Sequence, residues 1–420
     1  MADVSEGFGD CDKYFEGCLL NTKEILVKDI EKRSGEKLKE PYIVYLIETR
    51  CFNSHNDDAQ QSSCLWRRYS EFDLLRNYLQ TTYPSVIIPP LPEKKTNLAA
   101  FRLNAENYNM EFIERRRHGL EFFLHRIAKH SQLGLDEYFK SFLSQEEGWK
   151  ESVVESGFQN KAESKFKSIS ASYSVKKPDK KYEDMKNYSQ TLQGNIASLL
   201  KVQQKISEKQ LNIHREHANY GKIFSEWSSI EDEMGNALQK AGHYMDNFAS
   251  AIDDLQEEEE CRYVDKLKEY HLYADSIRVL TRKHQIRHYD LEKAEETVAS
   301  KTAQKDELLK VTEDGEEGKK SGLWKGLSSK IFGGDNPEAR EAKLQTLETQ
   351  IEESENAVTD AQQELSSFTK MADKDYEQFQ KQRDSDVKNI LIEHIKTQLK
   401  LCKLGISTWE NMKGAFEGMA

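Results

Sequence analysis

Hydrophobic and polar positions divide the chain into a short strand-containing part and a long helical part. Three apolar runs, 24–27, 42–47 and 64–69, are separated by polar turns, which is typical of an antiparallel meander. Helical spacing follows over 70–83 and again over 107–130. The first part is therefore predicted to be an α+β domain, with a three-stranded antiparallel sheet and helices.

Domain boundaries follow from changes in this pattern. Residues 1–20 are acidic and have no hydrophobic period, so we expect a flexible arm. The α+β domain is assigned to 21–147, an amphipathic linker to 148–181, and an all-α region to 182–420. Within the α+β domain, residues 87–92 form a proline segment that should be extended.

The linker carries apolar side chains at spacings of three and four, flanked by lysines, as an amphipathic helix does. Among these side chains are Phe158, Phe166 and Ile169. Two interpretations stay open: the helix lies in a membrane interface through these side chains, or it docks on a neighbouring domain.

The all-α region is almost free of prolines, which permits long helices over about 179–249, 252–312 and 337–413. At a rise of about 1.5 Å per residue, such helices reach roughly 90 to 120 Å. One compact core does not cover rods of that length. The sequence therefore predicts an elongated three-helix bundle that a second chain completes.

Two further stretches are candidate membrane contacts. The glycine-rich break before the third long helix combines lysines with Trp324 and Phe332, as an interfacial contact would, or as a loop packed on its own bundle. The second long helix has a basic run that faces either an anionic bilayer or solvent. This run consists of Arg278, Arg282, Lys283 and Arg287.

Composition and charge narrow the function classes. No apolar run reaches about 18 residues and the first residues lack a signal-peptide pattern, so we expect a cytosolic protein that reaches membranes peripherally. A net charge of −12 argues against a nucleic-acid binder, although local basic patches still decide the partner. The six cysteines form no CxxC pair, which argues against zinc and against a disulfide framework.

Enzyme motifs are missing from the sequence, which has no GxxxxGK[ST], GxSxG or HExxH. The pairs His214 with His217 and His284 with His288 have spacings that share a helix face, but no third ligand accompanies them. We therefore expect no catalytic activity, no metal and no other cofactor.

Cations and an aromatic residue from three separated places form the strongest candidate site. Arg68 ends the third strand, and its planar guanidinium matches two phosphate oxygens. Tyr69 offers a ring face, Lys94 follows the stiff proline segment, and Arg116 lies on the helix after it. Arg67 points to the other face of the sheet by strand alternation and is expected to be peripheral. These groups together predict a phosphorylated, cyclic ligand.

Short sequence strings carry a family resemblance. The first part resembles a phox-homology (PX) domain in the strings WRRYSEF at 66–72 and PPLPEK at 89–94. The helical part is similar to the BAR half of a sorting nexin in FSEW at 224–227 and GHY at 242–244. The resemblance runs over nearly the whole chain and leaves out the acidic arm.

The resemblance implies a ligand, phosphatidylinositol 3-phosphate. The implied contacts are Arg68 with the 3-phosphate, Tyr69 with the inositol ring, Lys94 with the 1-phosphate and Arg116 with the ring hydroxyls. Many PX domains have glycine where this chain has Glu93, and a carboxylate there opposes anion binding by Lys94.

The resemblance also implies an assembly and a place of action. A BAR dimer is expected, either a homodimer or a heterodimer with a related sorting nexin. It would act on the cytosolic face of early or recycling endosomes, in sorting, recycling and autophagy, with transmembrane cargo left open. The predicted function is a non-catalytic peripheral adaptor that senses or generates membrane curvature. The alternative is a coiled-coil scaffold whose N-terminal domain binds protein through the proline segment.

Overall fold

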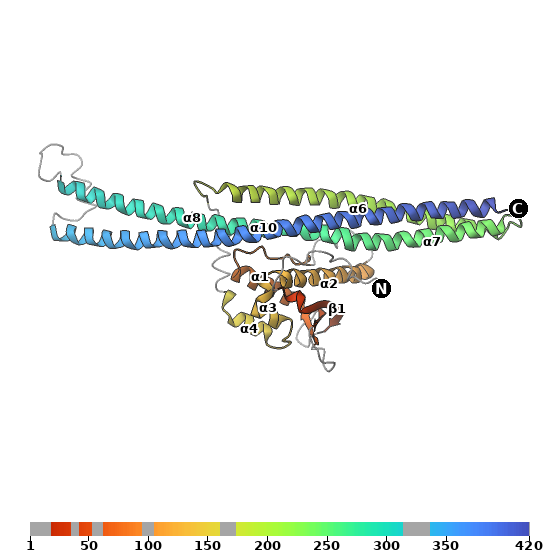
Figure 1. The fold of residues 1–420 in the computed structure, drawn as a ribbon, viewed down its shortest axis with the longest axis horizontal. Helices are drawn as coiled ribbons and strands as arrows, with labels where there is room; N and C mark the ends of the chain where they lie inside the picture. The colour runs from red at the N-terminus through yellow and green to blue at the C-terminus, as the bar shows by residue number, and fades with distance from the viewer. Residues whose placement is uncertain are drawn as a thin grey trace.

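The chain folds into a long bundle of helices with a small α+β domain against the middle of its length (Figure 1). The computed structural model describes residues 18–34, 42–52, 62–94, 105–159, 174–313 and 337–419. None of the helices in these ranges has an apolar stretch long enough to cross a bilayer.

The α+β domain is built on a three-stranded antiparallel sheet in the order β1-β2-β3. The strands are β1 (Lys23–Arg33), β2 (Tyr42–Cys51) and β3 (Ser62–Arg68). Val27, Ile47 and Leu65 pair across the sheet in one row and are all buried. These buried residues alternate with more exposed positions along the strands, as the sequence pattern indicated. The predicted antiparallel meander is confirmed.

Helices cover the buried face of this sheet. They are α1 (Tyr69–Thr82), α2 (Ala105–Lys129), α3 (Glu137–Phe142) and α4 (Trp149–Glu155), with 3-10 turns at Leu19–Asn21 and Leu133–Leu135. The apolar stripe of α2 packs into the core through Leu120, Phe123, Leu124 and Ile127. Period alone therefore located α1 and α2.

The start of the expected linker belongs to the α+β domain. Trp149 is buried, and its ring lies 4.8 Å from that of Phe142. Phe158 is 5% exposed and meets the ring of Tyr78 edge-on at 5.7 Å. Of the two interpretations left open, the membrane contact is wrong for Phe158, because this side chain packs into the core of the α+β domain.

The bundle contains three long rods, as predicted. They are α6 (Lys180–Ser228), then α7 (Gly235–Glu259) joined through a π-helical turn (Glu260–Val264) to α8 (Asp265–Glu313), then α10 (Pro337–Glu417). The first break lies at residues 229–234 and not near residue 250 as expected. A Cβ at Gly235 would lie 2.9 Å from the carbonyl oxygen of Ser228, so the tight return of the chain requires glycine there.

The two parts are joined by ion pairs between α2 and the bundle. Arg126 donates from Nε and Nη2 to the carboxylate of Glu269 at 2.8 and 3.0 Å, and its Nη1 lies 2.6 Å from Asp386. His130 Nε2 lies 2.7 Å from a carboxylate oxygen of Asp375. Each partner is largely buried, so these contacts fix how the α+β domain sits on the rods.

Replacing Arg126 with methionine should destabilise the chain by about 3 kcal/mol, because two partly buried carboxylates lose their cation. Urea unfolding measures the loss. The matched control is Arg33→Gln, which removes an exposed pair with Glu31 and should cost less than about 1 kcal/mol. Equal losses in the two variants would contradict the anchoring role of Arg126.

Candidate functional site

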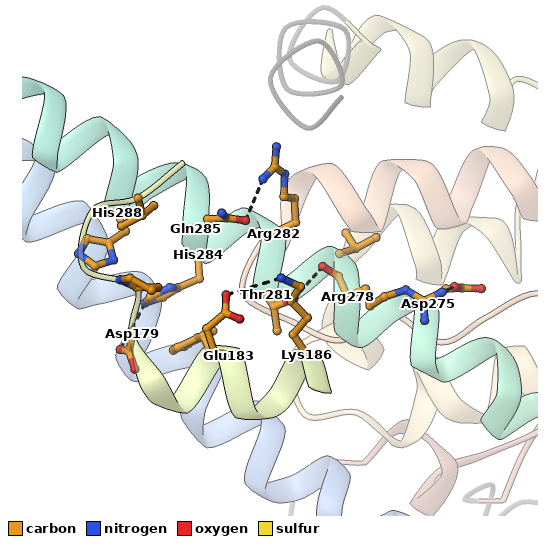
Figure 2. Close-up of a pocket in the computed structure, with 14 residues that line it drawn as sticks. Asp179, Glu183, Lys186, Asp275, Arg278, Thr281, Arg282, His284, Gln285 and His288 are labelled. Atoms are coloured by element: carbon orange, nitrogen blue, oxygen red, sulfur yellow. Dashed lines mark hydrogen bonds and ion pairs between the residues drawn. The ribbon is translucent and has the colours of Figure 1, made fainter. Parts of the chain in front are cut away.

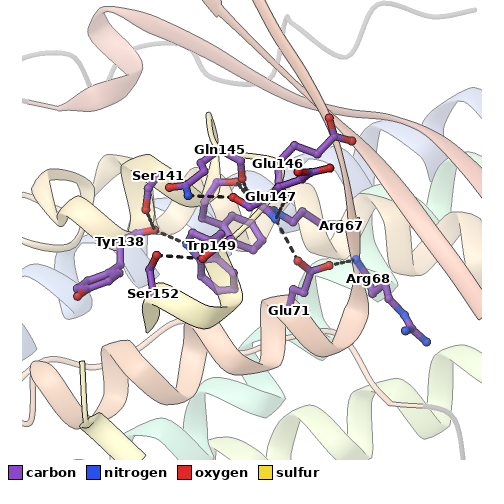
Figure 3. Close-up of polar contacts among 12 residues, drawn as sticks. Arg67, Arg68, Glu71, Tyr138, Ser141, Gln145, Glu146, Glu147, Trp149 and Ser152 are labelled. Atoms are coloured by element: carbon purple, nitrogen blue, oxygen red, sulfur yellow. Dashed lines mark hydrogen bonds and ion pairs between the residues drawn. The ribbon is translucent and has the colours of Figure 1, made fainter. Parts of the chain in front are cut away.

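The strand β3 ends in two arginines that point in opposite directions (Figure 3). Arg67 is 1% exposed and donates to the carbonyl oxygen of Phe142 at 3.0 and 3.2 Å and to Glu71 at 3.0 Å. Burial lowers the pKa of the Arg67 guanidinium, and Glu71 opposes that shift. Arg67 therefore ties the sheet to the end of α3, and strand alternation correctly placed it away from the site.

Arg68 points outward on the other face. Its guanidinium carbon lies 3.6 Å from the centre of the Tyr42 ring, and its main-chain N–H donates to Glu71 at 2.8 Å. Among the described residues, this guanidinium makes no hydrogen bond or ion pair. The stacked ring orients the planar fork, whose N–H donors remain available to an anion.

Tyr69 and Arg116 meet beside the proline segment. The Tyr69 hydroxyl donates to the carbonyl oxygen of Pro92 at 2.7 Å, and burial raises the pKa of this phenol to about 12. The guanidinium of Arg116 lies 4.8 Å from the centre of the Tyr69 ring, and its Nη2 donates to the carbonyl oxygen of Glu93 at 3.1 Å. The structure thus brings two of the predicted residues into direct contact.

Lys94 completes the group from the end of the proline segment. Its side chain is 70% exposed, and its Nζ lies 3.3 Å from a carboxylate oxygen of Asp73 on α1. An exposed pair of this kind is weak, so a phosphate can compete for the ammonium. Tyr69, Lys94 and Arg116 therefore each contact α1 or residues 92–93. The fourth predicted residue, Arg68, immediately precedes α1.

Sequence reasoning missed the residues that support these groups. Tyr42 holds Arg68, and Phe112 lies 4.5 Å beneath the Arg116 guanidinium. A Cβ at Gly119 would lie 2.7 Å from the Cβ of Pro92, so glycine lets α2 approach the proline segment closely. Only the contact between Phe112 and Arg116 had a local signal in the sequence, because residues four apart lie on the same face of a helix.

Two side chains of the basic run on α8 contact neighbouring elements of the protein. Lys283 is 7% exposed and donates to the carbonyl oxygen of Gln80 at 2.8 Å. Arg287 lies 3.0 Å from Glu364 and 4.3 Å from the centre of the Phe368 ring. The prediction that Lys283 and Arg287 contact a membrane is wrong, because their long side chains reach back onto neighbouring elements.

Arg278 and Arg282 line a groove of about 510 Å³ between the first turns of α6 and the middle of α8 (Figure 2). Arg278 donates to Gln193 at 2.7 Å and also pairs with Asp275. Arg282 donates to Gln285 at 2.8 Å. Both guanidinium groups therefore have protein partners within the groove.

His284 lies in the wall of the same groove. Its ring stacks on that of Tyr182, with centres 3.5 Å apart, and burial lowers its pKa to about 4. Within the described ranges, no three histidine, cysteine or acidic side chains are placed to hold a metal ion. The other candidate contacts, Phe166, Ile169, Trp324 and Phe332, lie outside the described residues.

The chain matches known protein families and also individual known proteins. A family model described as "PX domain" matches residues 55–146, and one described as "Vps5 C terminal like" matches residues 334–415. Sorting nexin-4 of Bos taurus is 44% identical over 99% of this chain and 91% of its own length. Sorting nexin-4 of Homo sapiens is 45% identical over 94% of this chain and 87% of its own length.

A solved structure shares the fold. The cryo-EM structure of the SNX-BAR Mvp1 tetramer superposes with a TM-score of 0.60, covering 92% of this chain and 99% of the matched chain. At 16% identity, this similarity concerns the arrangement of the elements alone.

The buried His284 predicts a pH-dependent stability. Between pH about 6.5 and about 4, the unfolded chain binds a proton at this position that the folded chain does not bind. The free energy of unfolding should therefore fall as the pH is lowered through this range. His284→Phe keeps the ring stack and should flatten the fall, as measured by urea unfolding at a series of pH values. Replacement of the exposed His243 by glutamine is the control, and an identical flattening there would contradict the prediction.

Proposed function

The chain belongs to the sorting nexin family, with a PX domain followed by a BAR-like helical region, and on that premise we propose a specific ligand and role. It is a non-catalytic adaptor that binds phosphatidylinositol 3-phosphate on early and recycling endosomes. It acts in endosomal sorting, recycling and autophagy as a dimer that senses or generates curvature. The membership itself makes the chain a membrane-associated sorting protein.

The ligand proposal rests on the Arg68 guanidinium. Its guanidinium is oriented by Tyr42 and has no hydrogen-bond or ion-pair partner among the described residues. A 3-phosphate can take two of its donors, while the Tyr69 ring lies beneath the inositol. Lys94 then reaches the 1-phosphate in exchange for its exposed pair with Asp73. Arg116 reaches the ring hydroxyls with donors that it does not use on the carbonyl oxygen of Glu93.

Arg68→Ala should weaken binding to liposomes containing phosphatidylinositol 3-phosphate by about tenfold to a hundredfold, because a charge-assisted fork is lost. Flotation with and without this lipid measures the effect. The control Arg50→Ala removes the same charge from β2, where Arg50 pairs with Glu48, and should leave binding intact. Tight binding by the Arg68 variant would refute the assignment of the headgroup.

Dimerisation is supported by apolar stripes that no described residue covers. On α10 they have the helical spacing of three and four, in Ile392, Ile395, Leu399, Ile406 and Trp409. On α6 a second exposed stripe contains Leu199, Val202, Ile206, Ile213, Tyr220 and Ile223. Both stripes lie on the half of the bundle that contains α7 (Figure 1). A second chain that buries these faces accounts for their exposure.

Ile395→Asp should convert the dimer into a monomer, because a charge would be buried between the chains. Sedimentation velocity at micromolar concentration measures the change. Met371→Asp, at an exposed position of α10 outside the stripe, is the matched control and should stay dimeric. A parent chain that sediments as a monomer would exclude the homodimer, so that either a related sorting nexin is the second chain or the prediction of a bundle completed by a second chain is wrong.

The alternative role of the proline segment as a protein ligand is not supported. Residues 85–90 are buried between the two domains. A partner domain that reads proline-rich peptides needs an exposed strand of that kind. We therefore do not propose a scaffold that binds protein through this segment.

A further inference from the structure

The proline segment is held at its beginning by the helical bundle. The side chain of Ile87 belongs to the core of the bundle, and that of the next residue, Ile88, belongs to the core of the PX domain. The main-chain N–H of Ile87 donates to Asp375 on α10 at 2.8 Å. The hydroxyl of Ser276 on α8 donates to the carbonyl oxygen of Ile88 at 2.8 Å. Two helices of the bundle therefore set the position of this backbone.

The other end of the same segment is a wall of the headgroup pocket. The Tyr69 hydroxyl bonds to the carbonyl oxygen of Pro92, and Arg116 bonds to that of Glu93. Lys94 follows directly. Each of these three ligand-binding side chains thus depends on where residues 92–94 lie.

Between the two ends the chain has little freedom. Pro89, Pro90 and Pro92 restrict the backbone to a narrow range of φ, and extended proline-rich chains stay stiff over several residues. A displacement at residues 87–88 is therefore passed on in part to residues 92–94, and Arg76 on α1 also holds the segment, donating to the carbonyl oxygen of Pro89 at 3.1 Å.

We infer that Asp375 and Ser276 are positioning residues for the phosphoinositide pocket, so that the helical bundle sets the affinity of the PX domain for its headgroup. This inference rests on the proposed function of the pocket. It assigns to two residues of the bundle, far from the pocket in sequence, a role in lipid recognition.

The sign of the expected effect separates positioning from simple electrostatics. Removing the carboxylate of Asp375 makes the protein less acidic, which by charge alone would strengthen the binding of an anion. If Asp375 acts by holding Ile87, its removal weakens binding instead. Asp375→Ala also removes the contact of Asp375 with His130, whereas Ser276→Ala leaves that contact in place.

The test titrates soluble dibutanoyl phosphatidylinositol 3-phosphate into the full chain by calorimetry, because a soluble headgroup removes avidity and curvature from the measurement. Asp375→Ala should weaken binding about fivefold or more. Asp375→Asn keeps an oxygen that accepts from Ile87 and should bind close to the parent. Ser276→Ala should weaken binding in the same direction and serves if the Asp375→Ala chain does not fold.

Lys283→Met is the matched control, since it removes a contact that the same interface makes with α1, at the carbonyl oxygen of Gln80. Its headgroup affinity should equal that of the parent. Unchanged or tighter binding by Asp375→Ala and Ser276→Ala overturns the inference, and so does an equal loss in Lys283→Met. A parent chain that does not bind the soluble headgroup overturns the proposed function itself, together with the inference that rests on it.

A second readout follows from the reciprocity of linked sites. If the pocket and the bundle are coupled through the segment, the headgroup must stabilise the bond from Ile87 to Asp375 as well. Hydrogen exchange of the Ile87 amide should therefore slow when the headgroup is added to the parent chain. Exchange that does not respond in the parent contradicts the coupling, whatever the affinities of the variants.

Discussion

The structure depends on the pairing of polar main-chain groups in a buried, irregular segment. The proline segment lies between two domains, and it belongs to neither a helix nor a sheet that would pair its N–H and carbonyl groups. Buried main-chain groups without partners cost about 1 to 3 kcal/mol each. Here they are paired by side chains, Asp375 and Ser276 from the bundle and Tyr69 from the PX domain. Because both domains supply partners, neither satisfies the segment without the other in place.

The surroundings of each arginine decide what it does in a run of similar residues. Arg67 and Arg68 are neighbours in sequence, yet one is buried against carbonyl oxygens and the other points outward over an aromatic ring. On α2, Arg115 pairs with Glu260 of the bundle, whereas Arg116 stacks on Tyr69 in the pocket. Strand alternation and the turn of the helix thus direct one arginine of each pair to a structural contact and the other to the proposed headgroup pocket.

Much of this fold was predictable because hydrophobic period reports local structure directly. The three strands and the helices α1 and α2 follow from it, as does the character of the bundle, whereas α4 lies in the stretch predicted to be a linker. Arg68, Tyr69 and Lys94 lie in recognisable strings and Arg116 lies on a predicted helix, which made all four candidates for the pocket. Their binding role stays a prediction. Period does not say which neighbour covers an apolar face. For Phe158 it leaves a membrane and a neighbouring domain equally open, and the core of the α+β domain covers this side chain.

The same limit explains the errors on α8. A lysine on a long helix is usually solvated, and only the position of α1, some two hundred residues earlier, makes Lys283 a donor to Gln80. Contacts between residues so far apart in the sequence depend on how the two domains dock. The pattern of hydrophobic and polar positions does not report that docking. Tyr42 was missed for a similar reason, since its role exists only where β2 lies beside the end of β3.

Rigid docking of the PX domain on the bundle affects how tightly a pocket of low affinity can hold a membrane. A headgroup held by one fork and a few exposed contacts binds modestly, and a dimer gains avidity only if both pockets meet the membrane together. Flexible domains would lose orientational freedom on binding, which subtracts from that gain. The ion pairs of Arg126 and the shared proline segment fix the orientation before any lipid is bound. In the proposed dimer, the rods between the two chains and the segment proposed to shape each pocket therefore act on the same equilibrium, the binding of the membrane.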